Sequence, residues 1–312
     1  MTVLPFICLA IGIALGLFVK SKKFPEVADK ISTVALIFLM LSIGVGIGLD
    51  KSIIESAPKI GFNCVVIAIF ALGFSVLFTV ICEKTVLPLK KLDEELKAKE
   101  LGLEQPEDEG KTSHLVWIMP VSVIIGLAAG IAFRGNISSD YVDMSLWISL
   151  IILYICVGVS QGANKEVFVF LKMLGVKVIW LSVAILLGSL VGGILSGLVL
   201  GLPFKMSLVS SSGMSFYSLT GAFMTKTFGL EVGTYGFIVN ILRELITIIT
   251  MPLLIKLSPG SPIAGGAAGC MDTMLAPVTK FVGVRLGLVT LITGTILTFI
   301  VPFLLPLLSL IV

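Results

Sequence analysis

Long apolar runs separated by short polar segments dominate this chain. Eight of them have about the length that a transmembrane helix needs, and they occupy residues 4–19, 31–49, 60–82, 115–133, 145–163, 178–200, 233–255 and 286–311. Two further stretches, 207–228 and 263–283, are apolar but rich in Ser, Thr and Gly, which is atypical of lipid-facing helices. We therefore expect an all-α polytopic membrane protein with eight transmembrane helices and two re-entrant or broken helices. Ten spans are the alternative.

Composition and charge agree with this class of protein. Hydrophobic residues make up 57% of the chain and charged residues 13%, as in multi-pass membrane proteins. With the N-terminus outside, the inner loops hold 16 Lys and Arg residues and the outer loops five. The positive-inside rule then places both termini outside. Basic residues are spread over short loops, so no nucleic-acid partner is expected.

An internal repeat runs through the first two thirds of the chain at a constant offset of 114 residues. Residues 11–17 match residues 125–131, and residues 36–45 match residues 150–159. Each unit holds three spans, an odd number, so the two units must have opposite orientations. This pattern is typical of inverted-repeat transporters.

A weaker repeat lies in the last third, where Gly229 and Gly233 correspond to Gly283 and Gly287. Each of these units is one Gly-rich stretch followed by one long helix. We expect four segments: a three-helix repeat (1–82), a charged, solvated cytoplasmic linker (83–114), the inverted repeat (115–202), and two units of a broken helix and a helix (203–312).

Acidic residues inside apolar sequence are the first candidates for function. Glu244 lies in the middle of a span, and Asp272 lies in the Gly-rich stretch before Pro277. An ionisable group at bilayer depth costs about 2.5–3.5 kcal/mol on insertion scales and usually faces a bundle interior or a cavity. Asp50 ends the second span, and the repeat pairs it with the neutral Asn164. The alternatives are a helix cap for Asp272 and a solvated interfacial charge for Asp50.

The Ser-rich stretch is the second candidate, because its hydroxyls could bind a zwitterion and its glycines allow the helix to unwind. A half-helix that starts here would aim its positive end at a carboxylate. Small residues for tight helix packing are the alternative. The candidate positions, with Asn240 from the following span, are Ser211, Ser212, Gly213, Ser215, Tyr217, Ser218 and Asn240.

Arg243 precedes Glu244 and is about 100° away from it around a helix, so the two do not simply pair with each other. For Arg243 we favour a structural ion pair with another helix. The chain has a single histidine, His114, and its five cysteines are scattered. No metal site, no cofactor and no enzymatic activity are therefore expected.

Three motifs in this order resemble the LysO-type lysine exporters of bacteria: residues 213–221 (GMSFYSLTG), Arg243-Glu244, and residues 269–272 (GCMD) followed by Pro277. The similarity is strongest over residues 205–285, and the pattern of spans extends it to the whole chain. The resemblance implies an inner-membrane exporter of L-lysine and lysine-like compounds, driven by proton antiport. It also implies that Asp272, Glu244 and Asp50 are the intramembrane acids.

Export of the lysine cation against an inside-negative membrane costs about 2.3 kcal/mol per 100 mV, so coupling to proton entry is physically reasonable. We expect Asp272 to bind the cation or a proton, with Glu244 and Asp50 assisting. A sodium/proton or organic-anion carrier on the same architecture is the alternative. The oligomeric state stays open, with a homodimer as one candidate.

Overall fold

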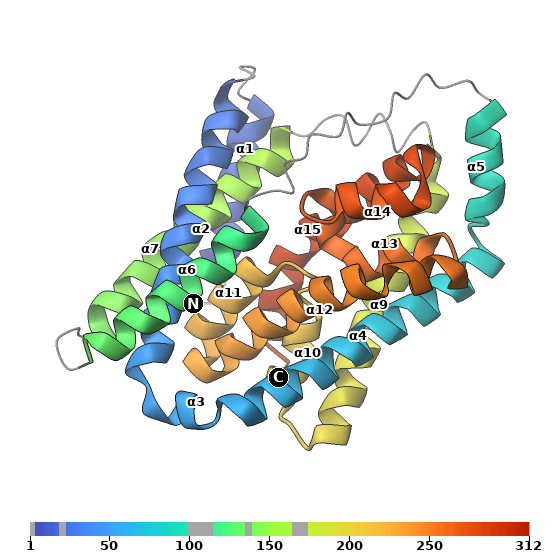
Figure 1. Ribbon diagram of the computed structural model, residues 1–312. Helices are drawn as coiled ribbons and strands as arrows, with labels where there is room; N and C mark the ends of the chain where they lie inside the picture. Colours follow the sequence, from blue (N-terminus) through green and yellow to red (C-terminus); the bar gives the residue numbers. More distant parts are fainter. Residues whose placement is uncertain (1–3, 19–22, 99–114, 135–138, 164–173, 312) are drawn as a thin grey trace.

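A computed structural model describes residues 4–18, 23–98, 115–134, 139–163 and 174–311, and the chain is helical through most of these ranges (Figure 1). The α-helices are α1 (Leu4–Phe18), α2 (Lys23–Leu49), α3 (Lys51–Glu55), α4 (Ala57–Thr85), α5 (Leu89–Ala98), α6 (Leu115–Ala132), α7 (Ser139–Ala163), α9 (Ile179–Leu200), α10 (Phe204–Ser211), α11 (Tyr217–Phe228), α12 (Leu230–Leu257), α13 (Gly260–Gly266), α14 (Leu275–Val282) and α15 (Val284–Leu308). Two 3-10 helices join them, η1 (Val176–Val178) and η2 (Ala267–Met271).

Within the described ranges, six helical segments are long and apolar enough to cross a membrane. They lie in α2, α4, α7, η1 with α9, α12 and α15. The expected first and fourth spans correspond to shorter apolar helices, Ile7–Phe18 within α1 and Val121–Ala132 within α6. The expectation of an all-α membrane protein is confirmed.

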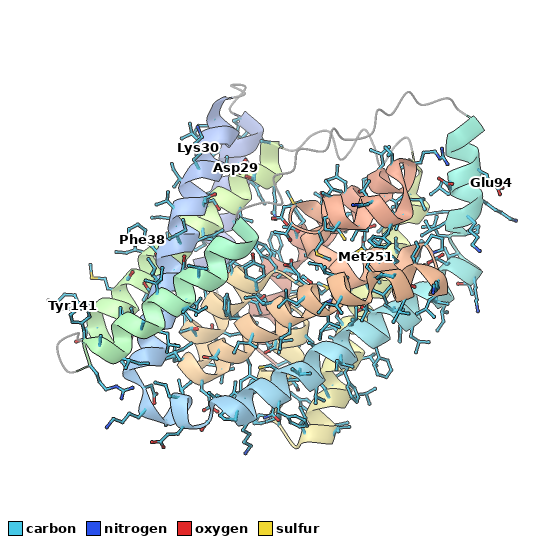
Figure 2. The ribbon with its side chains drawn as sticks, viewed as in Figure 1. Asp29, Lys30, Phe38, Glu94, Tyr141 and Met251 are labelled. Atoms are coloured by element: carbon cyan, nitrogen blue, oxygen red, sulfur yellow. The ribbon has the colours of Figure 1, made fainter. Side chains whose placement is uncertain are left out.

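The distribution of side chains is that of a protein surrounded by lipid. On the outer faces of α2 and α7, Phe38 is 57% exposed and Tyr141 is 75% exposed (Figure 2). The interior, by contrast, contains Asn240, Arg243 and Glu244. Large apolar side chains on the surface and polar side chains in the interior are the informative observations about the surroundings of a protein. Together they indicate that this protein is surrounded by an apolar medium.

Helices α1, α2, α6 and α7 form one group, in which α1 packs against α7 and α2 packs against both α6 and α7 (Figure 1). Glycines allow these contacts: a Cβ at Gly12 would lie 2.9 Å from the Cα of Gly158, and one at Gly126 would lie 3.1 Å from the Cα of Gly44. Gly126 follows Gly12 by 114 residues, and Gly158 follows Gly44 by the same number. The two contacts are therefore reciprocal under the sequence repeat.

Helix α4 connects α3 to α5 and packs against α9, α12 and α13. Its 29 residues extend for about 43 Å at 1.5 Å per residue. The start of the charged segment is ordered: in α5, Leu89 is buried and Asp93 forms a paired contact with Arg285 of α15, at 2.8 and 3.1 Å. This amphipathic part of the expected solvated linker therefore docks on the helix bundle. Residues 99–114 lie outside the described ranges.

Both Ser-, Thr- and Gly-rich stretches are broken helices, as their composition indicated. The first is α10 followed by α11, and the second is α13, η2 and α14. Each ends at a glycine with positive φ, Gly229 at 96° and Gly283 at 90°, before the next long helix begins. Glycine adopts positive φ without steric cost, and the chain turns at these two points so that α11 packs against α12 and α14 packs against α15.

Candidate functional site

The first break, residues 212–216, lies between α10 and α11. Met214 and Ser215 have φ values of 48° and 75° there, a conformation that is uncommon for residues with a Cβ and costs about 1–3 kcal/mol each. Such a backbone persists only where its surroundings over-determine it.

Asn240 of α12 supplies that constraint. Its Oδ1 accepts the backbone N–H of Ser215 at 2.8 Å, and its Nδ2 donates to the carbonyls of Ser210 at 2.8 Å and Gly236 at 2.7 Å. The side chain is fully buried. A Cβ at Gly213 would lie 2.6 Å from Nδ2, so only glycine fits beside this amide.

The second break meets the first through the backbone. Its first residue after α13, Ala267, has a φ of 46°. The next residue, Ala268, donates its N–H to the carbonyl of Met214 at 2.9 Å and accepts the Thr298 hydroxyl of α15 at 3.1 Å. Gln161 of α7 donates in turn to the Thr298 carbonyl at 3.1 Å. The two interrupted helices therefore cross where both have lost regular geometry.

The two acids singled out in the sequence are brought together by Thr273. Its hydroxyl donates to Oε1 of Glu244 at 2.9 Å, and its backbone N–H donates to Oδ1 of Asp272 at 2.5 Å. Glu244 is 5% exposed, whereas Asp272 is exposed. One carboxylate is thus enclosed by protein and the other is accessible, with a threonine between them.

The hydroxyls of the Ser-rich stretch differ in their hydrogen bonding. Ser211 and Ser212 donate to their own helix, to the carbonyls of Leu208 and Val209. The Ser215 hydroxyl is buried and has no partner among the described residues. Ser218 is also buried, at the start of α11. These two are better placed than Ser211 and Ser212 to offer a hydroxyl to a ligand.

Tyr217 is the first residue of α11 and stands beside Ser218. Its ring meets Phe237 of α12 edge-on at 5.9 Å. The break before α11 is linked to the helix of Glu244 through Asn240, which accepts the Ser215 N–H and lies about one turn before Glu244 on α12.

Arg243 is buried with its guanidinium among neutral oxygens. It donates to the hydroxyls of Ser75 at 3.1 Å and Ser189 at 2.8 Å, and to the carbonyls of Ala264 at 2.8 Å and Gly265 at 3.2 Å. The expected carboxylate partner is not found among the described residues. The two carbonyls belong to the last turn of α13, where the negative end of the helix dipole favours a cation.

Asp50 lies apart from this cluster and caps α3. Its Oδ1 accepts the backbone N–H groups of Ser52 at 2.9 Å and Ile53 at 3.4 Å, and the Ser52 hydroxyl at 2.7 Å. The Ser52 hydroxyl, together with these N–H groups, holds the pKa of the Asp50 carboxyl below its usual value. The other candidate of the repeat, Asn164, lies outside the described residues.

Several polar residues of the site were not singled out in the sequence. Thr273 could have been found from its position next to Asp272, and Ser75 and Ser189 from the repeat offset that separates them. Glu83 was counted with the charged segment, yet it accepts the Gly260 N–H at 2.9 Å and so caps the start of α13. In the described ranges, no three His, Cys, Asp or Glu side chains gather into a group suited to a metal ion.

Comparison with known proteins extends the similarity beyond these motifs. The Lysine exporter LysO of Escherichia coli (strain K12) is 29% identical over 187 residues, which are 60% of this chain and 62% of that protein, less than two thirds of its length. A "Putative lysine exporter" of Haemophilus influenzae (strain ATCC 51907 / DSM 11121 / KW20 / Rd) is 26% identical over 189 residues, 59% of this chain and 93% of that protein. The family profile described as Lysine exporter LysO matches residues 6–93 and 121–309. Because this match includes both broken helices and most of the chain, the protein belongs to the lysine exporter LysO family.

Proposed function

We propose that this protein exports L-lysine and lysine-like amino acids by proton antiport with alternating access. Membership of the family and the names of the two relatives support the substrate class. The observation that carries the mechanism is the pair of acids joined by Thr273 where the two broken helices cross. A carboxylate can hold either a proton or an ammonium group, and competition for one site is the minimal antiport mechanism.

In this proposal Asp272 is the main cation and proton site, because it is the accessible member of the pair. Glu244 is enclosed behind it and is linked to it through Thr273. A proton that arrives at Asp272 displaces the ammonium of lysine, and an arriving lysine displaces the proton. Asp50 assists lysine transport at a position separate from these two acids.

The start of α11 is the proposed site of the α-carboxylate. The first N–H groups of a helix have no partner within the helix, and the positive end of its dipole favours an anion. Ser215 lies just before this helix start, and Tyr217 and Ser218 are its first two residues. Broken helices in transporters commonly bind substrate carboxylates in this way.

We also propose eight spans and two re-entrant helices, arranged as inverted repeats with both termini outside. The reciprocal contacts of Gly12 with Gly158 and of Gly44 with Gly126 support a two-fold relation between the repeats. Alternating access would follow from movement of the α1–α2–α6–α7 group relative to the elements that cross at Met214. Inward proton movement would offset the cost of about 2.3 kcal/mol per 100 mV for exporting one positive charge.

Fluxes of protons and lysine measured together in proteoliposomes test this function. We expect an inward proton gradient to drive lysine accumulation on the opposite side, and Asp272→Asn to abolish it without loss of protein from the membrane. Glu55→Gln, an exposed acid on α3, is the matched control and should transport normally. Full activity of Asp272→Asn would contradict the proposal, and sodium-dependent flux without lysine counterflow would favour the alternative carrier.

A further inference from the structure

A polar cavity lies away from the crossing of the broken helices. It has a volume of about 610 Å³ and is formed where α2 and α3 meet α7 and the junction of α11 with α12. Four charged side chains line it, Asp50, Lys51, Asp143 and Lys226. A cavity of this size is within the range of small-molecule sites.

The charges around the cavity do not neutralise one another. No ion pair within 4.0 Å joins these acids to these lysines in the described part of the chain. Asp50 caps α3 through Oδ1 alone, which leaves Oδ2 without a partner there. Asp143 is exposed and has no hydrogen bond to another described residue.

Lys226 reaches the cavity from the last turn of α11. Its ammonium lies 4.6 Å from the centre of the Trp147 ring on α7. A cation–π contact of this kind positions the ammonium without cancelling its charge. The cavity is therefore lined by two carboxylates and two lysines, of which Lys226 is positioned by Trp147.

We propose that this cavity is a second binding site for a diamino acid. Lysine carries two ammonium groups and one carboxylate with two oxygens, and the cavity offers two carboxylates, Asp50 and Asp143, and two cations, Lys51 and Lys226. A simple anion would leave both acids without a cationic partner, and a diamine would leave the Lys226 ammonium without an anionic partner. An α-amino acid with a cationic side chain gives each acid an ammonium partner and gives the two lysines a carboxylate partner.

This inference rests on the proposed export of lysine and adds a second binding site along the path that lysine takes through the protein. With both termini outside, the end of α2 and the start of α7 face the exit side. The cavity would then receive lysine released from Asp272 before it leaves the protein. Its four charged groups come from three separated parts of the chain, α3 with its cap, α7 and α11, so movement of α7 relative to α11 would open or close it.

Equilibrium binding of radiolabelled lysine to the purified full-length protein tests the site. In an Asp272→Asn background, which disables the proposed inner site, we expect lysine still to bind. Adding Asp143→Asn should weaken that binding about tenfold, as expected for loss of a hydrogen bond to a charged group. Asp143→Glu should restore most of the affinity, and Glu55→Gln on α3 should leave it unchanged.

Competing ligands separate the roles of the charged groups. Norleucine lacks the side-chain ammonium and should compete poorly, whereas cadaverine lacks the carboxylate and should compete as well as lysine only in Lys226→Gln. Lysine affinity that is unaffected by Asp143→Asn and Lys226→Gln, or no lysine binding at all, would overturn the second site. Failure of the proposed function is a different result: the wild-type protein would show no lysine counterflow even if Asp143→Asn weakens binding.

Discussion

The hydroxyls of Ser75 and Ser189 share a hydrogen bond of 2.9 Å, and the two serines are 114 residues apart in the chain. They lie on α4 and α9, which pack against each other, and the separation equals the offset of the sequence repeat. Arg243 of α12 donates to both hydroxyls and to two carbonyls of α13. One guanidinium thus joins the two repeats to the second broken helix.

Replacing Arg243 should destabilise the fold more than it alters the chemistry of the site. Arg243→Ala would remove the donor from four buried acceptors, of which only one serine hydroxyl keeps a donor through the Ser75–Ser189 hydrogen bond, and each acceptor left unsatisfied costs about 1–3 kcal/mol. We expect a loss of at least about 3 kcal/mol of stability, and a smaller loss for Arg243→Lys, which keeps the charge but not the planar fork. Thermal unfolding in detergent measures both. Arg134→Lys, at an exposed arginine, is the control, and an equal effect there would contradict the role of Arg243.

Replacing Asn240 should disturb the first break. Asn240→Asp keeps the shape of the side chain and the bond from the Ser215 N–H. It also places a carboxylate oxygen against the carbonyls of Ser210 and Gly236. These buried carbonyls would then face another acceptor, which should lower the free energy of unfolding by about 2 kcal/mol or more. Lysine transport should also fall.

Ser215→Ala is the matched control for Asn240→Asp in thermal unfolding. The Ser215 hydroxyl has no partner among the described residues, and its backbone N–H to Asn240 is retained in the variant. We therefore expect little change in stability but weaker lysine binding if this hydroxyl contacts the substrate. A large loss of stability in Ser215→Ala with none in Asn240→Asp would contradict this account of the break.

Thr273 should be required for communication between the two acids. Thr273→Val preserves the shape but removes the hydroxyl that donates to Glu244, whereas Thr273→Ser keeps it. A hydrogen bond contributes about 0.5–1.5 kcal/mol, and more when its partner is charged, so we expect proton-driven lysine transport to fall by up to about tenfold in Thr273→Val. Transport by Thr273→Ser should stay near wild type. Equal rates for the two variants would show that the hydroxyl has no part in transport.

Asp50 combines a cap with a charge, and two substitutions separate these roles. Asparagine caps a helix as well as aspartate, whereas alanine costs about 1 kcal/mol. Asp50→Ala should therefore lower the melting temperature, and Asp50→Asn should not. A transport defect in Asp50→Asn at unchanged stability would assign the defect to the lost charge.

The contribution of the Asp50 cap should depend on pH in a defined direction. The pKa of this carboxyl is held below its usual value by the Ser52 hydroxyl and nearby N–H groups. The stabilisation is therefore complete above the unfolded pKa of about 3.9 and is lost as the pH falls through the lower folded pKa. Thermal unfolding between pH 3 and pH 7 should show this loss in the wild type and not in Asp50→Asn.

The sequence by itself predicted the helical membrane fold, because the length and hydropathy of each run are local properties. Composition also predicted the two broken helices: Gly213 allows the first to unwind, and glycines precede Ala267 in the second. The expected linker differed at its start, where Leu89 and Asp93 give α5 one face that packs against the bundle. Helix α5 is amphipathic, but its sequence does not show what it packs against. The tertiary structure shows that Arg285 of α15 pairs with Asp93.

Only the tertiary structure decided which polar groups meet. It placed Thr273 between Glu244 and Asp272, and it gave Arg243 the hydroxyls of Ser75 and Ser189 in place of a carboxylate. It also put Asp50 at a cavity away from the two acids. These contacts join residues far apart in the chain, and their geometry depends on how α4, α9, α12 and α15 pack. Local sequence shows that a polar group in an apolar run must be satisfied, but the packing of distant helices determines which partner satisfies it.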